Sequence, residues 1–259
     1  MAQIGWIDTH THLAYHDQAL LEDQLHYAYE HGVREIVAIS LDESEYHKHM
    51  SMAKEQSQLR IHVTCGAHPA DVYKWSEEKY TSFMKQLAKL DVVAIGEIGL
   101  DYYWDKEHHE LQKKRFIDQI HLANERQLPI LVHCRDAFED CLVILKQHPP
   151  LSGGIMHCYS GSKEMAMEFL KVGMDISLAG PLTFRNAKTP KEVASMVPLD
   201  RLHIETDAPY LTPHPFRGQR NHTGLVHYVG EELSRIKYMN ESDVKNQLAL
   251  NFERIFVKK

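Results

Sequence analysis

Long apolar runs, paired cysteines and basic clusters are all lacking in this sequence of 259 residues. No stretch approaches the roughly 20 consecutive apolar residues that a membrane-spanning helix needs, so we expect no membrane association. The opening residues, MAQIGWIDTHTHL, contain no basic segment followed by a long apolar run, and they therefore predict no signal peptide. Without export we expect reduced thiols in a cytoplasmic protein, because no C-x-x-C spacing joins Cys65, Cys134, Cys141 and Cys158.

Positive charge is also in short supply, since 36 acidic residues outnumber 29 basic ones and the formal net charge is −7. This balance argues against a protein devoted to packaging DNA or coating a membrane surface. It leaves open an enzyme that acts on nucleic acid, because bound cations would reverse the charge locally. The hydrophobic share of 43% is enough for a sizeable core, which excludes an intrinsically disordered chain.

Eight short apolar runs recur along the chain, and helical patterns lie between them. Most runs are rich in Val and Ile and are bounded by Gly, Pro or polar residues, which is typical of strands. Between two of them, Phe138, Cys141, Leu142 and Leu145 have the spacing of one helix face. The predicted strands are 4–8, 35–40, 62–67, 92–99, 129–134, 153–158, 175–180 and 202–207.

Strands that alternate with helices indicate an α/β fold with a parallel sheet, and eight is the number that closes a barrel. No linker rich in Ser, Gly or Pro divides the chain. We therefore predict a single (β/α)8 TIM barrel over residues 1–259, with its functional site at the carboxyl ends of the strands.

Histidines and carboxylates stand at the ends of five predicted strands. The motif DTHTH closes the first strand, and because side chains alternate along a strand, Asp8, His10 and His12 should share the inner face. Two imidazoles at this spacing can bind one metal ion. Strands four, five, six and eight contribute Glu97, His133, His157 and Asp207.

These ends converge on one face of a barrel, where active sites lie, so the sequence predicts a metal centre there. A carboxylate such as Glu97 inside an apolar run is costly to bury unless it is paired or binds a metal. Six ligands exceed the three or four of a single zinc ion and suit two divalent ions bridged by Glu97. Imidazole and carboxylate donors fit Mg²⁺, Mn²⁺, Zn²⁺ or Fe²⁺. By strand alternation Cys134 and Cys158 should face the helices, which makes thiol ligation the weaker interpretation.

Seven motifs together resemble one family: IDTHTHL, GAHP, GEIGLDYY, VHCRDA, HCYSG, ETDAPYL and HPFRGQRN closely resemble the TatD family of metal-dependent hydrolases and deoxyribonucleases. The resemblance covers essentially the whole chain and implies a TIM barrel of the amidohydrolase type. It implies hydrolysis of phosphodiester bonds, commonly 3′ to 5′ on single-stranded DNA. It also implies metal ligands at His10, His12, Glu97, His133, His157 and Asp207.

Two of these residues are expected to be catalytic: Asp207 as the general base toward a metal-activated water, and Glu97 as the bridge between the ions. Asp8 and Glu205 are expected to orient metal-ligating histidines. We expect single-stranded DNA as the substrate and no obligate protein partner. The predicted substrate-binding residues are His68, Arg135, Tyr159 and Arg217.

Several of these assignments have plain structural alternatives. His68 either contacts a substrate phosphate or a metal ligand, or it braces the turn at Pro69. Arg135 either binds a phosphate, or it pairs with Asp136 or is simply solvated. The rings of Tyr102 and Tyr103 either stack on bases or pack within their loop, and Asp101 accompanies them at the predicted mouth. A cationic rim or merely solvated side chains are the alternatives for Arg185, Lys188, Arg217 and Arg220.

The loop at 219–223 departs from the pattern of the family. Gln219 stands where a Lys is usual, and His222 and Thr223 stand where a Glu and a Pro are usual. One alternative function is an amidohydrolase-type enzyme that acts on a small ester, lactone or cyclic amide, and another is a non-catalytic metal-bound scaffold. The first alternative lacks the strand-four lysine that many such enzymes use as a metal bridge, because that position holds Glu97.

Overall fold

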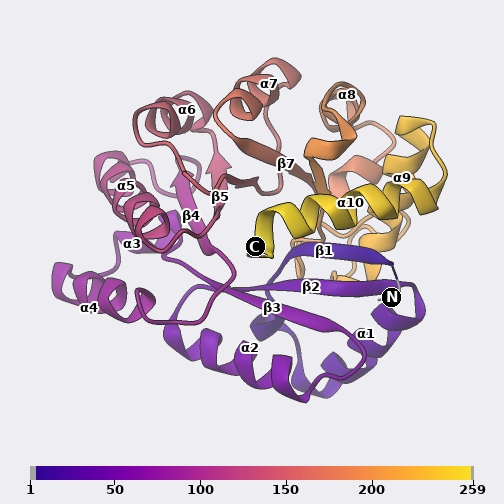
Figure 1. Ribbon diagram of the computed structural model, residues 1–259, viewed down its shortest axis with the longest axis horizontal. Coiled ribbons are helices and arrows are strands. Elements are labelled where there is room, and N and C mark those ends of the chain that lie inside the picture. The colour runs from indigo at the N-terminus through magenta and orange to yellow at the C-terminus, as the bar shows by residue number, and fades with distance from the viewer. Residues whose placement is uncertain (1–3, 258–259) are drawn as a thin grey trace.

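An eight-stranded parallel sheet dominates the computed structural model, which describes residues 4–257. The first three and last two residues of the predicted 1–259 unit lie outside the described residues. The strands follow the order of the sequence around the sheet, with helices outside it (Figure 1). The predicted (β/α)8 barrel is confirmed, and its strands are β1 Trp6–Thr11, β2 Val33–Ser40, β3 Arg60–Cys65, β4 Ile95–Asp101, β5 Ile130–Arg135, β6 Gly154–Met156, β7 Met174–Leu178 and β8 Leu202–Ile204.

The barrel closes between β1 and the segment that follows β8. The backbone N–H of His12 donates to the carbonyl of Ala208 at 2.8 Å, and that of Asp207 donates to the carbonyl of His10 at 2.9 Å. A parallel bridge joins Thr11 to Ala208. The first and last predicted ligands are therefore brought together by the backbone bonds that close the barrel.

Helices surround the strands, and sequence signals explain several of their first turns. Asp42, Ser76, Ser162 and Asn240 each accept a backbone N–H in the first turn of the helix that follows. None of the described helices is long and apolar enough to cross a membrane. The α-helices are α1 Gln18–Glu30, α2 Glu43–Glu55, α3 Pro69–Val72, α4 Glu77–Leu87, α5 His109–Glu125, α6 Phe138–Gln147, α7 Lys163–Lys171, α8 Lys188–Met196, α9 Val226–Lys237 and α10 Glu241–Phe256.

The last helix, α10, covers the amino-terminal end of the barrel (Figure 1). Phe252 and Phe256 form one buried cluster with Ile7 of β1, Leu131 of β5 and Ile155 of β6. These strand residues come from different sides of the barrel, so one helix can contact them all only across its end. The opposite end, where the strands finish, is left to the functional site.

Strand ends differ from the prediction in ways that matter for the site. β6 stops at Met156 and β8 at Ile204, so His157 and Asp207 lie on the loops just beyond their strands. The chain turns away from the sheet there, since Cys158 and Asp207 have φ values of 43° and 53°. β1 instead extends to Thr11, and its pairing with β2 shifts register after Asp8.

This register shift makes the predicted side-chain alternation in β1 wrong. Ile7 packs inside the barrel, and the hydroxyl of Thr9 reaches across to the carbonyl of Ile204 at 3.0 Å. Asp8 thus lies on the other face, where its carboxylate accepts hydrogen bonds from the hydroxyls of Thr206 and Thr223. A β-bulge inserts an extra residue and re-aims the side chains that follow, which returns His10 to the inner face.

Candidate active site

A single buried carboxylate, that of Glu97 on β4, lies at the centre of the predicted ligands. Its Oε1 atom is 2.8 Å from His133 Nδ1 and 2.9 Å from His157 Nε2. Its Oε2 atom is 3.4 Å from His10 Nε2 and 3.6 Å from His12 Nε2. The two oxygens therefore face two different histidine pairs, which is the arrangement expected of a bridging ligand.

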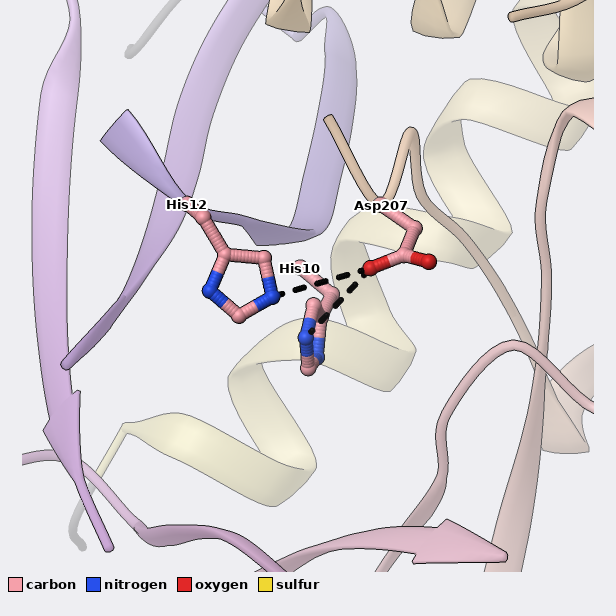
Figure 2. A group of neighbouring side chains, drawn as sticks. All are labelled: His10, His12 and Asp207. Atoms are coloured by element: carbon pink, nitrogen blue, oxygen red, sulfur yellow. Dashed lines mark ion pairs between the residues drawn. The ribbon is translucent and has the colours of Figure 1, made fainter. Parts of the chain in front are cut away.

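Asp207 completes the group on the β1 side. Its Oδ1 atom lies 3.9 Å from His10 Nε2 and 3.7 Å from His12 Nε2. Figure 2 shows both imidazoles turned toward this carboxylate, which comes from the loop after β8. The six predicted ligands, which lie in or just after β1, β4, β5, β6 and β8, are thus gathered at one end of the barrel.

Two further carboxylates, those of Glu205 and Asp101, contact histidine rings on the side remote from Glu97. Glu205 accepts a hydrogen bond from Nδ1 of His157 at 3.0 Å, as expected of an orienting residue. Asp101, which the sequence predicts only at the mouth of the barrel, lies 2.9 Å from Nε2 of His133. Each contact occupies the nitrogen remote from Glu97 and leaves the other nitrogen directed at the cluster.

The cluster has the electrostatics of a site that requires cations. Burial raises the pKa of Asp207 to about 8, and burial lowers the pKa of His10 and His12. Burial alone would raise the pKa of Glu97, but His157 and the neighbouring histidines outweigh it and lower that pKa well below its usual range. Burial also acts to lower the pKa of His133 and of His157, but contacts with Asp101, Glu97 and Glu205 outweigh it and raise both. The site thus combines two imidazoles that burial keeps neutral with two that nearby carboxylates help to protonate.

Unpartnered nitrogens show that these residues fit a metal. Among the described residues, neither ring nitrogen of His10 has a hydrogen-bond partner, and Nδ1 of His12 has none. Buried polar atoms are normally hydrogen-bonded, so orphaned imidazole nitrogens beside carboxylates are typical of a ligand set. Three groups of close ligand atoms lie within the described chain: His10–His12–Asp207, His10–His157–Glu205 and His68–Glu97–His133.

His68 braces the turn at Pro69 and also reaches the cluster, whereas its contact with a substrate phosphate stays a prediction. Its Nδ1 atom accepts the backbone N–H of Ala70 at 3.1 Å and so begins helix α3 at Pro69. Its Nε2 atom lies 3.4 Å from Oε1 of Glu97. The turn therefore fixes the ring, and the ring presents its second nitrogen to the cluster.

Two cavities flank the cluster, and both are lined by His133, Arg135, His157 and Asp207. The larger, about 510 Å³, is also lined by acidic and aromatic side chains that include Asp71, Tyr15, Trp104 and Tyr210. The smaller, about 300 Å³, is mainly apolar, with Tyr159, Leu178, Pro181, Leu182 and Leu211. Both cavities thus lie beside the same cluster residues.

Arg135 ends β5 at the junction of the two cavities. Among the described residues its guanidinium forms no ion pair with Asp136; it lies over the ring of Tyr103, 3.8 Å from the centroid. Tyr102 packs against two helices instead, because its hydroxyl donates to Asp140 of α6 at 2.7 Å and its ring stacks on His109 of α5. Of the two tyrosine rings, only that of Tyr103 packs against Arg135, a residue that lines both cavities.

The expectation for Asp8 is corrected by the structure. Asp8 contacts no histidine ring in the described chain; its oxygens accept from backbone and hydroxyl groups of Thr206, from the hydroxyl of Thr223 and from the backbone N–H of His10. It braces the junction of β1 with the segment after β8. Thr223 departs from the family pattern, yet its hydroxyl supplies one of these bonds.

The remaining predicted residues lie in different places. Tyr159 lines the smaller cavity with its ring, and its hydroxyl donates to the carbonyl of Ser162 at 2.8 Å. Arg217 lies outside both cavities, over the ring of Phe184. Arg220 donates to the carbonyl of Tyr15, so it belongs to no common rim with Arg217.

The cysteines take no part in the candidate ligand groups of the described chain. Cys134 and Cys141 are neighbours, and burial raises the pKa of the Cys134 thiol. The prediction for Cys158 is wrong, because its left-handed backbone turns it toward the smaller cavity rather than the helices. Burial also raises the pKa of this thiol.

Comparison with known proteins identifies the family and agrees with the fold. The profile of the family described as TatD related DNase matches residues 7–257. The chain belongs to the TatD family. The metal-dependent hydrolase YabD of Bacillus subtilis, a relative named as uncharacterized, is 43% identical over 251 residues, which cover 96% of this chain and 98% of the relative. YcfH of Escherichia coli K12, likewise named as an uncharacterized metal-dependent hydrolase, is 34% identical and covers 96% of this chain and 95% of its own.

Solved structures agree with this assignment. The TatD homologue YjjV of Escherichia coli K12 superposes with a TM-score of 0.90 at 27% identity and covers 98% of both chains. A TatD-family hydrolase from Entamoeba histolytica, at 23% identity and a TM-score of 0.85, shares the fold over both full lengths. The predicted resemblance is confirmed, and the protein is a metal-dependent hydrolase of the TatD family.

Proposed function

We propose that this TatD-family protein is a deoxyribonuclease that hydrolyses phosphodiester bonds of single-stranded DNA from the 3′ end. The observation that carries the proposal is the placement of Glu97, whose two carboxylate oxygens face two separate ligand groups. Paired divalent ions are a known arrangement for phosphoester hydrolysis. The deoxyribonuclease in the family description supports DNA as the polymer.

Charge balance supports two ions rather than one. Glu97, Asp101 and Glu205 are almost fully buried, and Asp207 is largely buried beside them. With Asp207 ionised as well, although burial raises its pKa to about 8, the four carboxylates carry four negative charges, and burial of uncompensated charge costs several kcal/mol per ion. Two divalent cations would neutralise them. His10, His12 and Asp207 would hold one ion, His133 and His157 the other, and Glu97 both.

Side chains of this protein then divide the remaining work. When bound, the ions would supply a water of lowered pKa and offset charge on the phosphate oxygens. Asp207 accepts the proton of the attacking water, since its carboxylate lies at the cluster and lines both cavities. Arg135 and His68 offer donors to non-bridging oxygens, where charge develops in the transition state.

An exposed set of aromatic side chains supports a single strand rather than a duplex. Trp104 is 69% exposed and Tyr210 is 56% exposed, and both line the larger cavity with Tyr15. Unpaired bases stack on such rings with a gain of roughly 1–3 kcal/mol per base. Paired bases are already stacked on each other and cannot use these rings without opening.

A cleavage assay tests the proposal directly. Metal-stripped protein is restored with Mg²⁺ or Mn²⁺ and mixed with single-stranded oligonucleotides that carry a label at either end. We expect stepwise shortening from the 3′ end that requires the metal and disappears in Glu97→Ala. Asp207→Asn should lower kcat by about 100-fold or more. Full kcat in Asp207→Asn with metal bound would show that another group is the base.

The second candidate is hydrolysis of a small ester, lactone or cyclic amide, which the apolar lining of the smaller cavity favours. Its residues Leu178, Leu182 and Leu211 would suit a compact apolar acyl group. A panel of lactones and cyclic amides, run beside the oligonucleotides with the same metal-restored protein, distinguishes the two. Turnover of the panel without cleavage of any oligonucleotide would replace the nuclease assignment.

A further inference from the structure

A third cavity, of about 390 Å³, lies between the loops that follow β7 and β8. Arg185, Asn186 and Ala187 line it from the β7 loop, and His214 and Arg217 line it from the β8 loop. None of its lining residues is acidic. In a protein with a net charge of −7, two arginines in one cavity without a carboxylate are a local reversal of sign.

Neither guanidinium group has a hydrogen-bond or ion-pair partner in the described part of the chain. Neither Arg185 nor Arg217 forms an ion pair within 4.0 Å or donates a hydrogen bond to any described residue. Arg217 lies over the ring of Phe184, 4.6 Å from the centroid, which fixes its plane and leaves its N–H edge free. A planar fork of free donors is suited to a phosphate group.

Neighbouring cations differ, because each of them is already engaged. Lys188 lies 3.7 Å from Glu192 one helical turn away, and Arg220 donates to the carbonyl of Tyr15.

Helix α8 begins beside the cavity, and its N-cap residue Ala187 has no side chain that can accept the first N–H groups. Helix N-termini after strands seven and eight frequently form phosphate sites in TIM barrels.

The cavity is continuous along the chain with the active site. The loops after β7 and β8 line the apolar cavity beside the metal ligands, through Pro181, Leu182 and Leu211, before they line the cationic cavity. The hydroxyl of Thr183 accepts the backbone N–H of His214 at 2.8 Å and ties the two loops together. A DNA strand that follows these joined loops away from the active site would therefore reach the arginines.

We propose that Arg185, Arg217, His214 and Asn186 form a second phosphate subsite, which binds a phosphate of the polynucleotide remote from the bond that is cleaved. The inference rests on the proposed nuclease function and adds a contact that only longer substrates reach. Short fragments would then bind through the metal centre alone, and affinity would rise once the strand spans both sites.

Oligonucleotide length is the variable that tests this subsite. Fluorescence anisotropy gives Kd for labelled oligothymidylates of two to ten nucleotides, in metal-restored protein that carries Asp207→Asn in every sample. Arg217→Gln and Arg185→Gln should each weaken binding of the longest strands about 10-fold and leave the dinucleotide unchanged. Lys188→Gln removes the same charge beside the cavity and should change every Kd less than twofold. Melting temperatures verify that each variant is folded.

A second probe separates this proposal from the nuclease assignment. Calorimetry with sodium tripolyphosphate and metal-stripped protein reports anion binding without DNA and without the metal centre. If no oligonucleotide binds but tripolyphosphate binding is lost in Arg217→Gln and kept in Lys188→Gln, the nuclease assignment fails and the anion subsite stands. Equal losses in Lys188→Gln, or no loss in either arginine variant with either probe, would overturn the subsite. If Arg217→Gln does not fold, Arg185→Gln decides.

Discussion

Asp101→Asn should weaken metal binding although it leaves every predicted metal ligand in place, because Asp101 contacts the ligand His133. Asp101 is fully buried, and its Oδ2 atom lies 2.9 Å from Nε2 of His133. Its Oδ1 atom accepts the backbone N–H groups of Tyr103 at 3.0 Å and Trp104 at 2.8 Å. Asp101→Asn can retain these two backbone bonds through its amide oxygen. Its NH₂ group then faces His133 in place of the second oxygen.

Two donors would meet at that contact. Nδ1 of His133 faces Glu97 and must be unprotonated to bind a cation, so its proton sits on Nε2 and points at Asp101. Loss of the acceptor forces the ring to turn or to change tautomer. Removal of such a supporting group typically lowers metal affinity by about 10–100-fold, or about 1.4–2.7 kcal/mol.

Calorimetric titration of metal-stripped protein with Mn²⁺ measures the effect. Asp105→Asn is the matched control, because Asp105 is a buried carboxylate in the loop after β4 that bonds His108 and Gln112 and no ligand of the cluster. We expect wild-type affinity in the control and weaker binding in Asp101→Asn. Unchanged affinity in Asp101→Asn, or an equal loss in Asp105→Asn, would refute the positioning role.

Three further outcomes follow from buried or exposed side chains. Burial lowers the pKa of His49 from 6.5 to about 4, so between those pH values the unfolded chain binds a proton that the folded chain excludes. The free energy of unfolding, measured in urea, should therefore be about 2 kcal/mol lower at pH 5 than at pH 7. His49→Gln should flatten this pH dependence. Burial would raise the pKa of Asp175, but its hydrogen bonds to His203 and to two arginines lower that pKa to about 2. The stabilisation that the ionised Asp175 provides is therefore complete above about pH 4 and is lost as the pH falls to 2. Asp175→Asn should lower the free energy of unfolding by roughly 3 kcal/mol in the same assay at pH 7. Trp104→Ala should weaken binding of single-stranded oligonucleotides by about 1–3 kcal/mol in anisotropy, while a calorimetric metal titration stays at the wild-type value.

The fold was predictable because its signals are repetitive and local. The eight strands match short apolar runs, most of them rich in Val and Ile, and α6 buries Cys141, Leu142 and Leu145 as its helical spacing predicts. Strand ends were less accurate, since they depend on neighbours that the local sequence does not reveal. β8, for example, ends at Ile204, which pairs with the last residue of β7, Leu178.

Strand alternation found the ligands but misplaced residues where the backbone departs from regular geometry. A register shift in β1 turned Asp8 away from the barrel interior, and a left-handed φ turned Cys158 toward it. Neither feature has a glycine or proline to announce it. Asp101 had a signal, a carboxylate four residues beyond Glu97 in one strand, but its partner His133 comes from the next strand. Cross-strand partners require the register, which composition does not supply.

The acidic surface implies that affinity for DNA comes from few, close contacts. At 0.1 M salt the Debye length is about 10 Å, so distant acidic side chains of this −7 protein neither attract nor strongly repel the strand. The phosphates that matter are those at the metal centre, at Arg135 and at the cavity of Arg185 and Arg217. Each phosphate neutralised on a single strand contributes about 0.7 to the slope of log Kd against log salt, so three predict a slope of about 2. A slope near 5 in anisotropy titrations from 0.05 to 0.3 M NaCl would mean a longer basic track than these residues provide.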